Sequence, residues 1–195
     1  MHHDGVPISR LYVSDLLPEF EGAGHTLFKD ADRFTPGHFI IGDIFDNNPE
    51  NSPLAKTAGT WSVVSIVMFL HLFSMDESEI ACAQIIKLLR PDPGSFIIGA
   101  QTGTVNPGEF AVPPPLVDPG VHKVVWRHSR ESMIEMWERV GEKLGVKLKV
   151  WADYDLDEIN EREAEEAAKE QNGNRPNRFF VGRDQRRIFF LVESV

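Results

Sequence analysis

The sequence has very little cysteine and no long hydrophobic run. Cys82 is the only cysteine among 195 residues, which excludes an intramolecular disulfide and a zinc site built from several thiolates. The longest apolar stretch, residues 63–73, contains Ser65 and His71 and is shorter than the roughly 20 residues of a membrane helix. Residues 1–10 lack the apolar segment of a signal peptide. These absences predict a cytoplasmic protein with no membrane partner.

Basic residues are also scarce. The chain has 20 lysine and arginine residues against 30 aspartate and glutamate residues, for a formal net charge of -10. A nucleic-acid partner would call for a basic face, so this balance predicts no nucleic-acid partner. Much of the excess lies in Asp153 to Glu170, with nine acidic and two basic residues. We expect an exposed helix over about residues 156–170.

Several catalytic motifs are missing. No G-x-S-x-G, G-x-x-x-x-G-K-[ST] or G-x-G-x-x-G pattern occurs, which removes the usual support for hydrolase and P-loop readings. His25, His71 and His128 do not have the spacing of metal ligands, and acidic residues do not cluster with them. The sequence therefore predicts no metal site.

What is present is an alternation of strand-like and helix-like segments. This alternation is typical of an α/β sheet, and the length fits one domain over residues 1–195. The run Trp61 to Phe73 predicts a central parallel strand buried on both faces. The other predicted strands are Arg10–Ser14, His38–Gly42, Ser95–Ala100, Lys147–Trp151 and Arg187–Val192.

Two helices are indicated by caps and apolar spacing. Asp76, with Glu79 three residues later, predicts a helix that ends before Pro91. Ser129 predicts the start of a second helix that ends near Gly145. The turn-rich residues Gly173, Asn174 and Pro176 predict a linker before the last strand.

Candidate site residues lie where strands are expected to end. Asp15 and Asp43 each follow a predicted strand, and ligands of open α/β sheets bind at the carboxyl ends of the strands. A carboxylate there can accept hydrogen bonds from a ribose or an adenine amino group, although aspartate at a strand end is also a common turn former. His71 ends the longest apolar run and is either a buried core residue or a crevice residue.

Six blocks in order make the sequence resemble the fungal class I methyltransferases of terpenoid and meroterpenoid biosynthesis. They cover nearly the whole chain. The blocks are 11–16 with 18–20, 42–46, 69–73, 88–91 with 93–95, 99–103, and 128–129 with 136–137 and 140–141.

The resemblance implies an α/β, Rossmann-like class I methyltransferase sheet in three layers, of strand order 3-2-1-4-5-7-6, with a C-terminal antiparallel hairpin. It also implies S-adenosylmethionine as cofactor and a small apolar acid or terpenoid as acceptor, O-methylated on a carboxylate. His71 would be the catalytic, orienting residue. Cofactor-binding residues would be Asp15, Leu16, Asp43, Ile44, Phe69 and Leu70, and substrate-binding residues would be Gln101, Trp126 and His128, on or beside a loop from Gln101 to Trp126 that closes over the acceptor.

The chain departs from the resembled family at its start. It lacks the family's first strand and glycine-rich cofactor loop, so the fold is expected to be N-terminally truncated, with its middle strand missing. Either the two flanking strand edges pair, or their backbone groups stay unpaired.

Three alternative functions are compatible with these features. The chain is a methyltransferase, active as a homodimer or with a full-length relative; or it is an inactive remnant that serves as a dimer partner; or it is another nucleotide binder that uses Asp15.

Overall fold

The structure is a computed structural model that describes residues 5–34, 37–156 and 184–195. The chain forms two compact units, Met1–Thr60 and Trp61–Val195, and one domain over residues 1–195 stays a prediction. The predicted acidic helix, apart from its first residue Leu156, and the predicted linker lie outside the described residues. Within those residues no helix is long and apolar enough to cross a bilayer.

The first unit contains a small parallel sheet. Strand β1 (Val13–Asp15) pairs with β2 (Phe39–Ile41), and Asp15 lies opposite Ile41. The predicted strand at residues 10–14 starts too early, because Ile8–Arg10 form a 3-10 turn, η1. A second 3-10 turn, η2, spans Ala55–Thr57.

Helix α1 (Glu19–Phe28) joins β1 to β2 and was not predicted. Its two glycines and the absence of a buried face weaken the periodic signal on which helix prediction depends. The usable signal was local, since Pro18 precedes two glutamates in the first turn. Leu27 and Phe28 are 73% and 71% exposed.

The second unit contains a mixed four-stranded sheet in the order β3-β4-β8-β7. Its strands are β3 (Val63–Val67), β4 (Phe96–Thr104), β7 (Leu148–Tyr154) and β8 (Gln185–Ser194). β3 and β4 are parallel, whereas β8 is antiparallel to both β4 and β7. The predictions of an α/β fold and of a C-terminal antiparallel hairpin are confirmed.

The predicted central strand, residues 61–73, is wrong in length and position. β3 ends at Val67, because Met68 adopts a left-handed backbone conformation (φ 53°), and the 3-10 turn η3 (Leu70–Leu72) follows. Among the described residues β3 pairs only with β4, and Val67 is 62% exposed. A continuous apolar run does not reveal how many neighbours a strand has.

The loop predicted from Gln101 to Trp126 is also partly wrong. β4 continues to Thr104, because β8 pairs with it at every position from Phe96 to Thr104. The proline-rich segment then contains an antiparallel hairpin of β5 (Gly108–Ala111) and β6 (Val124–Arg127). Gln101 is therefore a strand residue, and Trp126 lies in β6.

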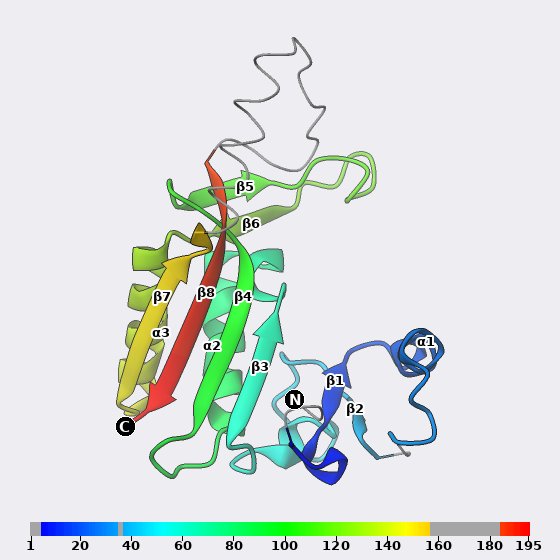
Figure 1. Cartoon of the computed structure of the whole chain (residues 1–195). Helices are drawn as coiled ribbons and strands as arrows, with labels where there is room; N and C mark the ends of the chain where they lie inside the picture. Colours follow the sequence, from blue (N-terminus) through cyan, green and yellow to red (C-terminus); the bar gives the residue numbers. More distant parts are fainter. Residues whose placement is uncertain (1–4, 35–36, 157–183) are drawn as a thin grey trace. The chain divides into compact units, whose positions relative to one another are not determined.

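Helices α2 (Met75–Leu88) and α3 (Arg130–Leu144) cover one face of the four-stranded sheet (Figure 1). The core between them and the strands is fully buried. Its members include Ala81, Cys82, Ile85, Met133, Met136, Trp137, Ile97, Ile188 and Val192.

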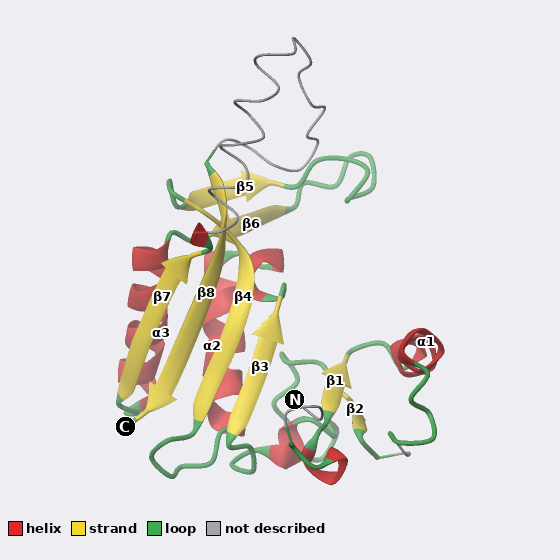
Figure 2. Ribbon diagram, viewed as in Figure 1, coloured by secondary structure: helices red, strands yellow, loops and turns green. Residues whose placement is uncertain are grey.

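The opposite face of this sheet carries no described helix of the second unit (Figure 2). Five apolar residues on its strands are 36–62% exposed and alternate with buried or half-buried residues: Val63, Val67, Trp151, Phe189 and Leu191. The third layer of the implied fold therefore stays a prediction for this unit.

The cap of α3 was predicted correctly and that of α2 was not. Ser129 accepts a hydrogen bond from the Ser132 backbone, and Gly145 ends the helix. For α2 the cap is Ser74, whose side chain accepts from the Glu77 backbone, while Glu77 accepts from the Ser74 backbone at 2.9 Å. The predicted pair of cap residues, Asp76 and Glu79, overlaps the observed pair in the sequence. Glu79 instead forms ion pairs with two basic residues of α3, Arg139 and Lys143.

Replacing Ser74 with alanine is expected to lower the free energy of unfolding by about 1 kcal/mol, because a capping hydrogen bond is lost. Asp76→Ala is the matched control. Asp76 only contributes a first-turn charge, so about 0.5 kcal/mol or less should be lost. Urea denaturation followed by circular dichroism measures both, and equal losses would contradict the assignment of the cap.

Candidate functional site

Asp15 and Asp43 lie at the same end of the small parallel sheet. Asp15 is the last residue of β1, and Asp43 comes two residues after β2. The Gly42 backbone N–H donates to the Asp15 carbonyl at 3.0 Å, which fixes the two strand ends side by side. A side chain at Gly42 would meet the backbone nitrogen of Leu54 at 3.3 Å and its Cβ still closer, so glycine permits the turn after β2.

Each aspartate uses one carboxylate oxygen for a local turn. Asp15 Oδ1 accepts from the Leu17 backbone, and Asp43 Oδ1 accepts from the Phe45 backbone, both at 2.9 Å. Within the described part of the chain, Oδ2 of each has no hydrogen-bond partner. Each aspartate therefore forms a turn and has an Oδ2 atom without a partner among the described residues, and its role in binding a cofactor stays a prediction. Leu16 is 58% exposed beside Asp15, and Ile44 is half-buried beside Asp43.

In the second unit, the residues after β3 form the short turn η3. Leu70 is 1% exposed, and its carbonyl accepts from the Ser78 hydroxyl at 3.4 Å. The Leu70 side chain is therefore part of the core, with no open surface for a cofactor. Phe69, at the start of the turn, lies edge-on to Phe73 at 5.1 Å between ring centroids.

His71 is half-buried in η3. Its Nδ1 atom is buried and has no hydrogen-bond partner among the described residues. Burial lowers the pKa of His71, and the nearby positive charge of Arg127 lowers it further. The ring is therefore held toward its neutral form, which can donate one hydrogen bond and accept another.

Gln101 and His128 are both buried. Gln101 is 1% exposed in β4, and its Nε2 has no partner in the described structure. His128 is 0% exposed, and its Nδ1 lies 3.0 Å from the Ser132 hydroxyl. Burial lowers the pKa of His128 to about 4. Trp126 is half-buried, lies edge-on to His128 at 6.2 Å, and has a buried indole N–H without a described partner.

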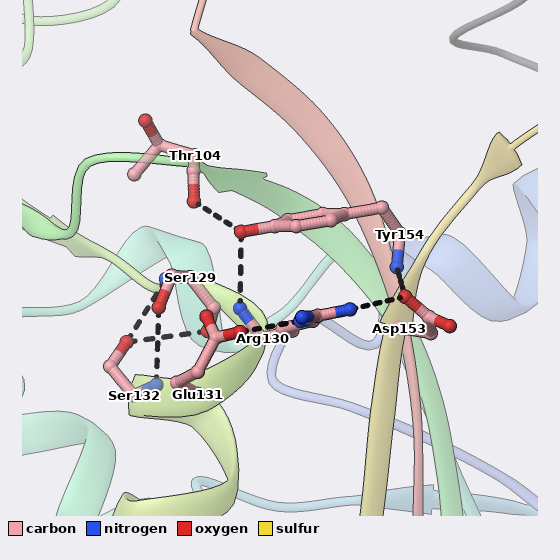
Figure 3. Close-up of polar contacts among 7 residues, drawn as sticks. All are labelled: Thr104, Ser129, Arg130, Glu131, Ser132, Asp153 and Tyr154. Atoms are coloured by element: carbon pink, nitrogen blue, oxygen red, sulfur yellow. Dashed lines mark hydrogen bonds and ion pairs between the residues drawn. The ribbon is translucent and has the colours of Figure 1, made fainter.

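Polar contacts hold residues 129–132, which directly follow His128 in the sequence (Figure 3). The Tyr154 hydroxyl donates to the Thr104 carbonyl at 3.2 Å and accepts from the Arg130 backbone at 3.4 Å. The charged Arg130 side chain is compensated by Glu131 and by Asp153. The ends of β4, α3 and β7 are thereby joined at one place.

Arg127 was not predicted from the sequence as a site residue. It is half-buried at the end of β6, and its guanidinium carbon lies 5.3 Å from the centroid of the Phe110 ring. Its Nε and Nη1 atoms are buried without a described partner. No sequence signal could have found it, because an arginine at the end of a short strand usually points into solvent.

The unpaired buried side-chain atoms of the described residues share one property: all are nitrogens. At most the two histidine atoms can accept, and the others can only donate. A ligand that satisfies such atoms must supply hydrogen-bond acceptors. The atoms belong to His71, Gln101, Trp126, Arg127, His128 and Trp137. No group of three or more described His, Cys, Asp or Glu side chains could hold a metal ion.

No protein-family model matches the chain. Individual proteins do match. The chain is 32% identical over 169 residues to the O-methyltransferase phiE of a fungus (Fungal sp. strain ATCC 74256), covering 87% of this chain. It is 34% identical over 149 residues to the O-methyltransferase atr3 of Stereocaulon alpinum, covering 76% of this chain. The chain belongs to the family of these fungal methyltransferases. It spans only 51% and 41% of their lengths.

Solved structures agree on the fold of this family. A Burkholderia thailandensis 1,6-didemethyltoxoflavin-N1-methyltransferase, solved with S-adenosylhomocysteine, superposes with a TM-score of 0.55 over 95% of this chain and 61% of its own, at 11% identity. The [4+2]-cyclase SpnF superposes with a TM-score of 0.54 over 94% of this chain and 66% of its own, also at 11% identity. The predicted Rossmann-like methyltransferase fold is confirmed, and the cyclase shows that this fold alone does not decide the reaction.

Proposed function

We propose that the protein is an S-adenosylmethionine-dependent methyltransferase that O-methylates a carboxylate on a polyketide–terpenoid metabolite. The observation that carries the proposal is the pair Asp15 and Asp43, whose Oδ2 oxygens have no partner among the described residues and lie at one end of two parallel strands in a relative of fungal methyltransferases.

The first unit fits the nucleoside part of the cofactor. A ribose has two adjacent hydroxyls, and the free Oδ2 of Asp15 can accept from them. Asp43 offers the same acceptor beside the half-buried apolar Ile44, which suits an adenine ring with its amino group. Exposed Leu16 supplies further apolar surface next to Asp15.

S-adenosylmethionine, when bound, supplies an electrophilic methyl group on a sulfonium, and transfer to a carboxylate forms one C–O bond, breaks one S–C bond and releases no proton. The acceptor is already ionised at neutral pH, so no strong base is needed. His71, held toward its neutral form, then serves to orient the acceptor by hydrogen bonding. Proximity and the exclusion of water supply most of the rate enhancement in such a displacement.

The three residues predicted to bind the acceptor differ in exposure: Trp126 is half-buried, whereas Gln101 and His128 are buried. Trp126 offers a half-buried ring and an indole N–H that has no partner among the described residues, which suits an apolar acceptor that carries an oxygen. Gln101 and His128 are buried inside the second unit, and the His128 ring lies against that of Trp126. Phe69 adds a half-buried aromatic ring from η3.

A non-catalytic dimer partner is the second candidate. It is favoured by the edge strand β3, whose outer side is unpaired among the described residues and whose Val63 and Val67 are exposed. A monomer at all concentrations in sedimentation velocity would remove both this candidate and the expected homodimer.

Replacing Asp15 with asparagine is expected to weaken binding of S-adenosylhomocysteine by about 10- to 150-fold, because a hydrogen bond to a charged acceptor contributes about 1.5–3 kcal/mol. Isothermal titration calorimetry measures the change. Asp32→Asn is the matched control, since Asp32 is exposed in the same unit and its substitution removes the same charge. Absence of binding by the unsubstituted chain, or preference for NAD, would contradict the proposal.

A further inference from the structure

The Arg127 guanidinium is half-buried, and its Nε and Nη1 atoms are buried without a hydrogen-bond partner among the described residues. Burial lowers its pKa, which means that the surroundings disfavour the charged form. No carboxylate of the described residues pairs with it, although the sequence holds more acidic than basic residues. Buried N–H donors are rarely left without an acceptor, and an anion would satisfy both of these nitrogens and match the charge of the guanidinium.

Arg130, three residues later, shows how an arginine is compensated in the same region. Its guanidinium contacts Glu131 and lies 3.5 Å from Asp153 (Figure 3). Arg127 instead lies over the Phe110 ring at 5.3 Å. A ring face orients a guanidinium and leaves its N–H groups free to donate.

The backbone joins the strand that carries Arg127 to the segment that follows His71. The Trp126 N–H donates to the Phe73 carbonyl at 2.7 Å, which ties β6 to the end of η3. The charge of Arg127 is close enough to depress the pKa of His71. Buried nitrogens of both side chains, Nδ1 of His71 and Nε and Nη1 of Arg127, have no hydrogen-bond partner among the described residues.

We propose that Arg127, with His71 beside it, binds a carboxylate of the methyl acceptor. The inference rests on the proposed function and names the group that selects its substrate. A guanidinium matches a carboxylate in charge and in planar geometry. Arg127 is then a specificity-determining residue that admits acids and rejects their neutral analogues.

The test compares one acid with its neutral counterpart. Farnesoic acid and its primary amide have the same chain and differ in charge, and each is titrated into the protein saturated with S-adenosylhomocysteine at pH 8. We expect the unsubstituted chain to bind the acid at least 10-fold more tightly than the amide. Arg127→Gln should remove this preference, Arg127→Lys should keep part of it, and Arg130→Gln should leave it unchanged.

Two outcomes overturn the inference while leaving the cofactor part of the proposed function intact. One is saturable binding of S-adenosylhomocysteine by an unsubstituted chain that does not discriminate acid from amide. The other is an Arg127→Gln variant that melts like the unsubstituted chain and still prefers the acid. The acid-to-amide ratio of the unsubstituted chain does not depend on whether any variant folds.

A third outcome concerns the cofactor itself. If Arg127→Gln weakens S-adenosylhomocysteine binding more than 3-fold, the anion is the cofactor's carboxylate, and the assignment to the acceptor is overturned. If S-adenosylhomocysteine does not bind at all, the proposed function fails, and the assignment that rests on it fails as well.

Discussion

Replacing Gly99 with alanine is expected to destabilise the second unit by about 1–3 kcal/mol, the usual cost of overpacking a filled core. A Cβ atom at this position would overlap the Phe190 ring and lie 2.6 Å from the Ile66 carbonyl oxygen. The ring belongs to β8 and the carbonyl to β3, so both neighbours of β4 are pushed at once. Urea denaturation monitored by circular dichroism measures the loss.

Gly108→Ala provides the matched control. Gly108 also lies in a strand, β5, and nothing is within 4 Å of a Cβ atom there. The same substitution should therefore change the free energy of unfolding by less than about 0.5 kcal/mol, the usual range for sites without a packing conflict. Equal stability of the Gly99→Ala and unsubstituted proteins would mean that β3, β4 and β8 are not packed as described.

Acidification from pH 6.5 to pH 4 is expected to remove about 3 kcal/mol of stability through His128. The pKa of this fully buried histidine is lowered from 6.5 to about 4 in the folded protein, so the unfolded chain binds the proton first as pH falls. The stabilisation is complete above pH 6.5 and is lost as pH drops toward 4, with about 2 kcal/mol gone at pH 5. Urea midpoints at a series of pH values measure the slope.

His128→Gln should flatten this dependence, whereas His122→Gln should preserve it, because His122 is exposed. His71, whose pKa is also lowered, contributes in the same direction. The difference between the unsubstituted protein and His128→Gln therefore isolates one residue. Glu77, Glu79 and Glu131 have lowered pKa values, and their effect appears only below about pH 4.5. An unchanged slope in His128→Gln would contradict a neutral buried imidazole.

Prediction from the sequence succeeded where local and tertiary forces agree. Helix α3 has a serine cap, a terminal glycine and an apolar stripe that all indicate the same segment, and the structure places Met133, Met136 and Trp137 in the core. Strand β3 is the contrary case. Its run of valine and isoleucine is compatible with any strand, and whether it lies inside or at the edge of a sheet depends on segments far along the chain.

The candidate site could be predicted only in part for the same reason. Asp15 and Asp43 were identifiable because strand ends carry their own turn chemistry, and the structure brings them together. Leu70 could not be recognised as core, because its burial depends on the packing of η3 against α2. Arg127 could not be identified either, since the absence of a counter-ion is a property of the folded neighbourhood.

The placement of β8 inside the sheet affects when the sheet can fold during synthesis on the ribosome. β8 separates β4 from β7, yet it is synthesised about 80 residues after Thr104, the end of β4. At about 5–20 residues per second, roughly 4–16 s therefore pass between the synthesis of β4 and that of β8, and during this time one hydrogen-bonding edge of β4 lacks its partner strand. During that interval the edge is available to other nascent chains, and the four-stranded sheet can be completed only after residues 185–194 have been translated.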